Sequence, residues 1–168
     1  MIMEKTPIRR NEHILRLSRE HHFSLLFCWK IRQGVKKGIA PERMISYAGY
    51  FLKYHAEPHF REEEEIIFDQ FPDEMTLRAV EEHIALRRLF EEIISHAGKE
   101  DEQITGLLSS LAENLDSHVR FEERELFPYL EKKLNEKELS RIGSALDALP
   151  TGPRDDYADE FWLNKSSL

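Results

Sequence analysis

The chain has 168 residues, which is enough for one domain that buries a core without disulfides or a stapling metal ion. Its 24 lysines and arginines are outnumbered by 32 aspartates and glutamates, and the net charge is −8. The sequence contains no block of basic residues that could follow a phosphate backbone, which argues against nucleic acid as a partner.

The apolar residues are never grouped into a run of about 18 or more, and the N-terminal residues lack the apolar core of a signal peptide. We therefore expect no contact with a membrane and a cytoplasmic location. Cys28 is the sole cysteine, which excludes a disulfide framework and a thiolate metal site.

Apolar residues recur every three or four positions in four successive stretches, which predicts four long helices. The first helix is expected from Asn11 to about Gly38, and the second from Pro41 to Phe68. Pro58 lies inside the second helix and removes one backbone hydrogen bond, so we expect a bend just before His59.

The third predicted helix follows a capping residue, Asp73, and stops at Gly98. Asp101 is the expected cap of a fourth helix that reaches about Leu134, with Pro128 bending or ending it late. A short fifth helix begins with a capping box formed by Asn135 and Glu138 and ends near residue 149.

These elements predict an all-α fold, an up-down-up-down four-helix bundle with a short C-terminal helix and a tail. Residues 1–150 would form the bundle with its fifth helix, and residues 151–168 the tail. The tail contains Tyr157, Phe161 and Trp162, which could dock either on the bundle or on a second subunit of a homodimer.

An internal repeat marks the ends of the second and fourth helices. Residues 59–68 read HFREEEEIIF and residues 118–127 read HVRFEERELF, so His, Arg, two Glu and Phe match at five offsets. Both contain H-x-x-x-E, a spacing that places imidazole and carboxylate one turn apart, roughly 6 Å along the axis, on one helical face.

That face is predicted to be apolar in both helices. His59 shares it with Leu52 and Ile66, and His118 shares it with Leu115 and Leu126. An unpaired carboxylate in a bundle core costs several kcal/mol, so Glu63 and Glu122 require a cation there. Facing helices of bundles build metal sites from such residues.

The other two helices each add an inward histidine. His83 shares its face with Ala79 and Leu86, and His21 shares its face with Leu17 and Leu25. In the first helix His22 is the rival of His21, but its face is more polar. Three further candidates are His55, one turn before His59, as an auxiliary ligand, and Glu64 and Glu123 as residues that hold a ligand in place.

The segments EHH at residues 20–22, HFREE at 59–63, EEH at 81–83 and HVRFEE at 118–123 resemble the hemerythrin-like, or HHE cation-binding, domain. The resemblance covers about residues 11–134. It implies a non-haem di-iron centre in which two carboxylates bridge the irons and four histidines complete the ligand set: Glu63, Glu122, His21, His59, His83 and His118.

The resemblance also has two departures from the oxygen-carrying hemerythrins. They place a further histidine four residues after the ligand of the third helix, where this chain has Arg87. They also have an aspartate five residues after the histidine of the fourth helix, where this chain has Glu123. The ligand set is closer to that of hemerythrin-like proteins of iron–sulfur repair and iron sensing, which argues against reversible oxygen transport.

Imidazole and carboxylate ligands suit iron, and also manganese or zinc. The function favoured by the sequence is binding of, or reaction with, oxygen, nitric oxide or peroxide in sensing, iron handling or stress response. The alternative is a redox enzyme that scavenges nitric oxide or peroxide, an oxidase, or an iron–sulfur repair protein.

Overall fold

A computed structural model describes residues 9–152 and 154–164, and within these ranges the regular structure is helical, without strands. A short 3-10 turn, η1 (Glu12–Ile14), leads into α1 (Leu15–Lys36). The second long helix consists of α2 (Pro41–Phe51), η2 (Leu52–Ala56), α3 (Glu57–Glu63) and η3 (Glu64–Phe68). Then follow α4 (Glu74–Ser95), α5 (Ile104–Phe121), η4 (Glu122–Leu126), α6 (Phe127–Lys133) and α7 (Glu136–Asp147).

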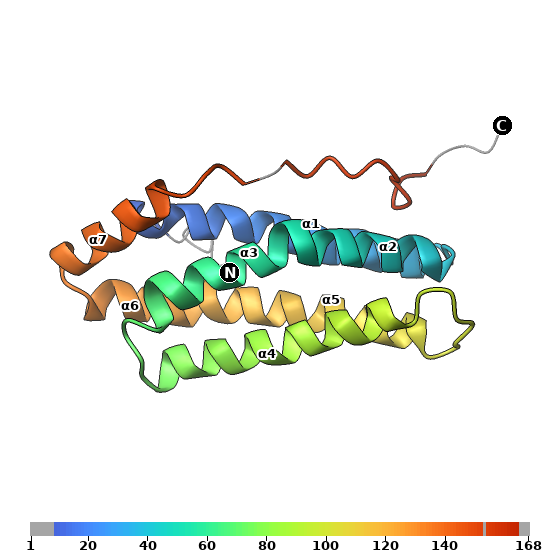
Figure 1. Ribbon diagram of the computed structural model, residues 1–168, viewed down its shortest axis with the longest axis horizontal. Helices are drawn as coiled ribbons and strands as arrows, with labels where there is room; N and C mark the ends of the chain where they lie inside the picture. Colours follow the sequence, from blue (N-terminus) through green and yellow to red (C-terminus); the bar gives the residue numbers. More distant parts are fainter. Residues whose placement is uncertain (1–8, 153, 165–168) are drawn as a thin grey trace, which may run out of the picture.

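The four long helices lie side by side and successive helices run in opposite directions (Figure 1). The predicted four-helix bundle is thus confirmed. Short connections enforce this topology, because each helix must return beside the previous one to bury its apolar stripe.

The segments η2, η3 and η4 are single π-helical turns. Two of them precede a proline by two residues, since η2 ends before Pro58 and η4 before Pro128. In each, the closing bond spans five residues, from Glu57 N to Leu52 O and from Phe127 N to Glu122 O. The wider turn accommodates the proline ring, so both helices continue without a break.

The helix caps agree with the sequence at two positions and differ at one. Asp73 and Asn135 both form capping boxes, before α4 and α7. The prediction that Asp101 caps the fourth helix is wrong, because the helix begins at Ile104 with Gln103 as its N-cap. The Asp101 carboxylate instead accepts a hydrogen bond from the Gln103 amide in the turn before the helix, at 2.8 Å.

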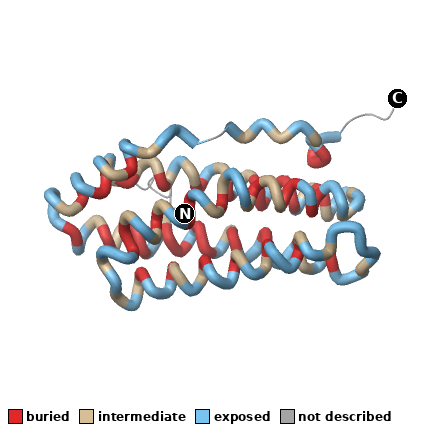
Figure 2. Tube along the Cα trace, in the orientation of Figure 1, coloured by how far each residue is buried: buried red, intermediate tan, exposed pale blue. Residues whose placement is uncertain are grey.

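Two apolar clusters form the core, one toward each end of the bundle. Along η1 and α1 the first cluster includes Phe27 and Ile31 and the second includes Ile14 and Leu17, which leaves His21 between them. In α4 His83 likewise lies between the two clusters, and in the second long helix Glu63 does. Figure 2 shows that buried residues recur along all four long helices.

Residues 154–164 lie along α1 and α2 (Figure 1). Phe161 and Trp162 are buried, and Phe161 packs where Gly34 has no side chain. The Nζ atom of Lys30 lies 2.7 Å from the carboxylate of Asp155 and 4.0 Å from the centre of the Trp162 ring. The aromatic residues of the tail therefore dock on the bundle of their own chain.

Within the described ranges, no helix has both the length and the apolar character that a bilayer crossing requires.

Candidate metal centre

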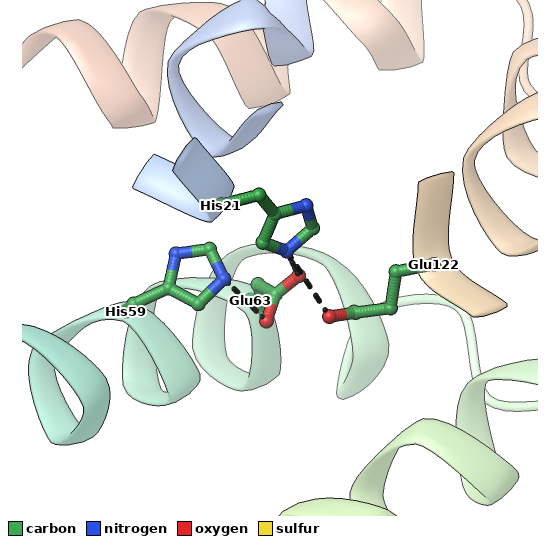
Figure 3. Close-up of side chains that lie close together, drawn as sticks. All are labelled: His21, His59, Glu63 and Glu122. Carbon is green, nitrogen blue, oxygen red and sulfur yellow. Dashed lines mark ion pairs between the residues drawn. The ribbon is translucent and has the colours of Figure 1, made fainter. Parts of the chain in front are cut away.

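Four buried side chains from three helices meet at one point in the middle of the bundle, which we call position one. They are His21, His59, Glu63 and Glu122 (Figure 3). The Nε2 atom of His59 lies 3.0 Å from Oε1 of Glu63, and that of His21 lies 3.3 Å from Oε1 of Glu122. The Glu63 carboxylate also lies 3.8 Å from Nε2 of His21, so it faces both imidazoles.

A second group, which we call position two, uses the same two carboxylates from the other side. It consists of Glu63, Glu122, His83 and His118. The Nε2 atoms of His83 and His118 lie 3.3 Å from Glu63 and 2.7 Å from Glu122. In each group the candidate ligand atoms lie within 4.8 Å of one another. Glu63 and Glu122 therefore face both positions.

The ligand atoms at the two positions have no hydrogen-bond partner. Among the described residues, the buried atoms without a partner include Nε2 of all four histidines and both carboxylate oxygens of Glu63 and Glu122. The short distances between these atoms, such as 2.7 Å between His118 and Glu122, are ion-pair distances without hydrogen-bond geometry. Buried polar atoms without partners are costly, and metal ions at the two positions would satisfy them.

Each imidazole also contacts an outer carboxylate through Nδ1, the ring nitrogen that faces away from the two positions. The Nδ1 atom of His83 lies 2.6 Å from Glu64, and that of His21 lies 2.7 Å from Glu123. The other two contacts run from His118 to Glu82 at 2.8 Å and from His59 to Glu20 at 3.2 Å. An ionised carboxylate can only accept, so Nδ1–H donates and the Nε2 lone pair faces inward.

The electrostatics keep these outer carboxylates ionised. Burial would raise the pKa of Glu123, but its contacts with His21 and Arg10 lower it to about 2. Burial would likewise raise the pKa values of Glu20, Glu64 and Glu82, but contacts with a histidine and an arginine leave each below the ordinary value. The outer carboxylates are thus suited to accept hydrogen bonds from the imidazoles.

The pKa values of Glu63 and His118 show that the inner site favours additional positive charge. Burial and the neighbouring Glu122 raise the pKa of Glu63 to about 8. Burial would lower the pKa of His118, but Glu122 and Glu82 raise it to about 10. Protons on Glu63 and His118 would meet this demand, and so would metal cations, which compete with protons for the same atoms.

Aromatic rings screen the site from water. The ring of Phe60 stacks on His83 with 4.1 Å between centroids, and Phe127 stacks on His21 at 5.4 Å. Both phenylalanines are buried. This apolar wall fixes the imidazole planes and lowers the local dielectric around the carboxylates.

The structure distinguishes the alternatives that the sequence leaves open. His21 is buried in position one, whereas His22 is exposed. His55 stacks on Phe51 at 5.2 Å and belongs to neither group of candidate ligands. Arg87 pairs with Glu57 and Glu64 at 2.8 and 2.9 Å, and of these two carboxylates Glu64 contacts His83.

Sequence reasoning identified Glu64 and Glu123 as residues that hold ligands but missed Glu20 and Glu82. Both directly precede an inward histidine, as Glu20-His21 and Glu82-His83. The repeated Glu-His pair was the available signal. It is weak alone, because a glutamate next to a histidine on a helix is ordinarily a solvated residue.

Together the fold and the site define a helical bundle protein with buried histidine and carboxylate groups that could hold metal cations. The family model described as the hemerythrin HHE cation-binding domain matches residues 12–130, with a second match over 74–149. The chain belongs to this family, and binding of metal cations is what the family indicates. Comparison with curated proteins and with solved structures gives no match.

Proposed function

We propose that the protein is a non-haem di-iron protein that binds or reacts with oxygen, nitric oxide or peroxide, in sensing, iron handling or stress response. The observation that carries this proposal is the pair of buried groups that share Glu63 and Glu122. One ion at each position would receive two imidazole nitrogens and a carboxylate oxygen from each glutamate.

The donor set is compatible with iron, and its place in a bundle core favours iron or manganese over zinc. Imidazole and carboxylate without thiolate suit iron, manganese or zinc, and histidine–carboxylate sites in bundle cores are typical of di-iron and di-manganese proteins. When bound, iron would supply a redox couple and coordination positions that the protein leaves open. The chain's own residues orient the ligands and exclude water.

Anaerobic reconstitution tests the proposal. The metal-free protein is titrated with Fe²⁺, and we expect two ions per chain, taken up cooperatively because both carboxylates serve both ions. A saturated stoichiometry of one ion, or occupancy by zinc alone after iron-replete expression, would contradict the di-iron proposal.

Reactivity with oxygen separates a carrier from a reactive centre. Neither group of candidate ligands among the described residues contains a third histidine, and Arg87 stands one turn after His83. We propose that an ion at position two is consequently open to small molecules and that oxygen oxidises the reduced protein without a reversible adduct. Repeated recovery of the reduced spectrum after removal of oxygen under vacuum would restore oxygen carriage.

A further inference from the structure

An arginine lies behind each carboxylate that holds a histidine. Three of these ion pairs are short: Arg10 with Glu123 at 2.8 Å, Arg78 with Glu82 at 2.9 Å, and Arg87 with Glu64 at 2.9 Å. In the fourth pair, Arg16 and Glu20 are 4.0 Å apart. Each of the four histidines is thus backed by a carboxylate and then by a guanidinium.

Two of the four arginines belong to a second internal repeat. The pattern R-x-x-x-E-H occurs at residues 16–21 and again at 78–83. It places each arginine one turn before the glutamate on the same face of its helix. The other two arginines come from unrelated places in the chain, Arg10 before η1 and Arg87 within α4.

The four arginines differ in how firmly they hold their carboxylates. Arg87 donates two N–H groups to Glu64, at 2.9 and 3.1 Å, a bidentate geometry that fixes the carboxylate plane. Arg16 instead donates to Glu62 at 3.1 Å and to the carbonyls of Leu146 and Pro150. Its guanidinium is therefore engaged away from Glu20.

The histidine contacts show the same division into three short distances and one long one. The three histidines whose carboxylates have a close arginine make contacts of 2.6, 2.7 and 2.8 Å. His59, whose carboxylate is Glu20, makes the longest contact, 3.2 Å. His59 is therefore the least firmly held of the four imidazoles, and position one is less rigid than position two.

We propose that Arg10, Arg78 and Arg87 are positioning residues of the metal centre and that position one, which contains His59, releases its ion before position two. The proposal rests on the proposed two-metal function. Each arginine acts through its carboxylate, which fixes the imidazole so that Nε2 meets the ion without reorganisation.

The direction in which metal affinity changes distinguishes a positioning role of Arg87 from a purely electrostatic one. A guanidinium near a metal cation repels it, so loss of Arg87 through charge alone would tighten metal binding. Loss of a positioning contact would weaken metal binding, because Glu64 and His83 would no longer be fixed. Arg87→Gln thus gives opposite results under the two accounts.

The experiment uses Co²⁺ as the probe, with binding followed by calorimetry and by paramagnetic proton resonances of the histidine rings. Arg87→Gln should weaken binding of one of the two ions about tenfold, which is the lower end of the range seen for residues that support a ligand without binding the metal. Arg87→Lys should recover part of the lost affinity. Arg78→Gln should act in the same direction, and its side chain is 52% exposed, so the variant is expected to fold. The matched control, Arg43→Gln, removes a surface arginine that pairs with Asp159 of the tail and should leave both affinities unchanged.

Stepwise removal of Co²⁺ from the wild-type protein with a chelator tests the order of release. The one-ion form should keep the shifted ring resonances of His83 and His118 and lose those of His21 and His59. Retention of the His21 and His59 resonances instead, or unchanged or tighter binding in Arg87→Gln and Arg78→Gln, would overturn the inference. A wild-type protein that binds fewer than two Co²⁺ ions would overturn the proposed function together with it.

Discussion

His83 and Glu64 are joined by the shortest of the four histidine–carboxylate contacts, 2.6 Å between Nδ1 and Oε2. Glu64 directly follows Glu63, whose Oε1 atom lies 3.3 Å from Nε2 of the same imidazole. Two consecutive glutamates thus lie close to the two different nitrogens of one imidazole ring. Glu63 ends α3 and Glu64 begins the π turn η3, and both side chains reach His83 of α4.

Glu64→Gln should weaken metal binding by about tenfold to a hundredfold, because a neutral amide is a poorer acceptor for the His83 Nδ1–H. Glu65→Gln is the matched control, since Glu65 is the next residue and its side chain is exposed. Competition with a coloured chelator measures both affinities. Equal affinities in the two variants would show that the Glu64 contact does not support the site.

Glu63→Gln and Glu122→Gln should each lower the metal content below that of any single histidine variant, because each carboxylate faces both positions. His55→Gln should retain two ions, since His55 lies outside both groups. Metal content after reconstitution with Fe²⁺ and desalting is the measurement. Similar losses in all three variants would mean that the ligand set is wrongly chosen.

Asp73 couples the start of α4 to α6 through Tyr129 and Lys133, whose donors lie 2.6 and 2.5 Å from its carboxylate. Burial would raise the pKa of Asp73, but Lys133, Tyr129 and the Thr76 amide lower it well below the ordinary value. An aspartate in an unfolded chain has a pKa of about 4. This contribution to stability is therefore present above about pH 4 and is lost as the pH falls toward the folded-state pKa.

Asp73→Asn isolates that charge, because asparagine keeps an oxygen that can accept from the amides of Met75 and Thr76. Urea unfolding should show the variant to be less stable than the wild type at pH 7, with the difference shrinking below about pH 4. A difference that stays constant down to about pH 2 would rule out the charge as its cause.

Phe161→Ala should destabilise the protein by about 3 to 5 kcal/mol, the range for truncating a buried phenylalanine. Its ring is 1% exposed. Leu163→Ala, two residues on, removes a side chain that is 45% exposed and should change the unfolding free energy by less than about 0.5 kcal/mol. Thermal unfolding of both variants checks the pair, and a small effect of Phe161→Ala would show that the tail does not contribute to the core.

Most of the bundle follows from periodicity, but the details of its faces do not. A strict period of 3.6 residues places Leu52 and Ile66 on the face of His59, whereas both are only partly buried and Phe51 and Ile67 are buried instead. The π turns cause this difference, because each inserts an extra residue into the helix and rotates the face that follows. The prolines indicate an irregularity but not its type.

The candidate site was more predictable than its supports. The repeated H-x-x-x-E and one inward histidine in each remaining helix select the six side chains that the structure brings together. The distant partners could not be predicted from spacing. Arg10 and Glu123, for example, are 113 residues apart in sequence, and their contact depends on how the segment before η1 lies against the fourth helix, where Arg10 also pairs with Glu131.

The docking of the tail on α1 has a consequence for synthesis of the chain. Lys30 and Asp155 are 125 residues apart, as are Lys37 and Trp162. During translation the surface of α1 and α2 that Phe161 and Trp162 cover must remain bare until the tail has left the ribosome. The nascent bundle therefore presents an apolar surface until residues 154–164 have been synthesised and cover it.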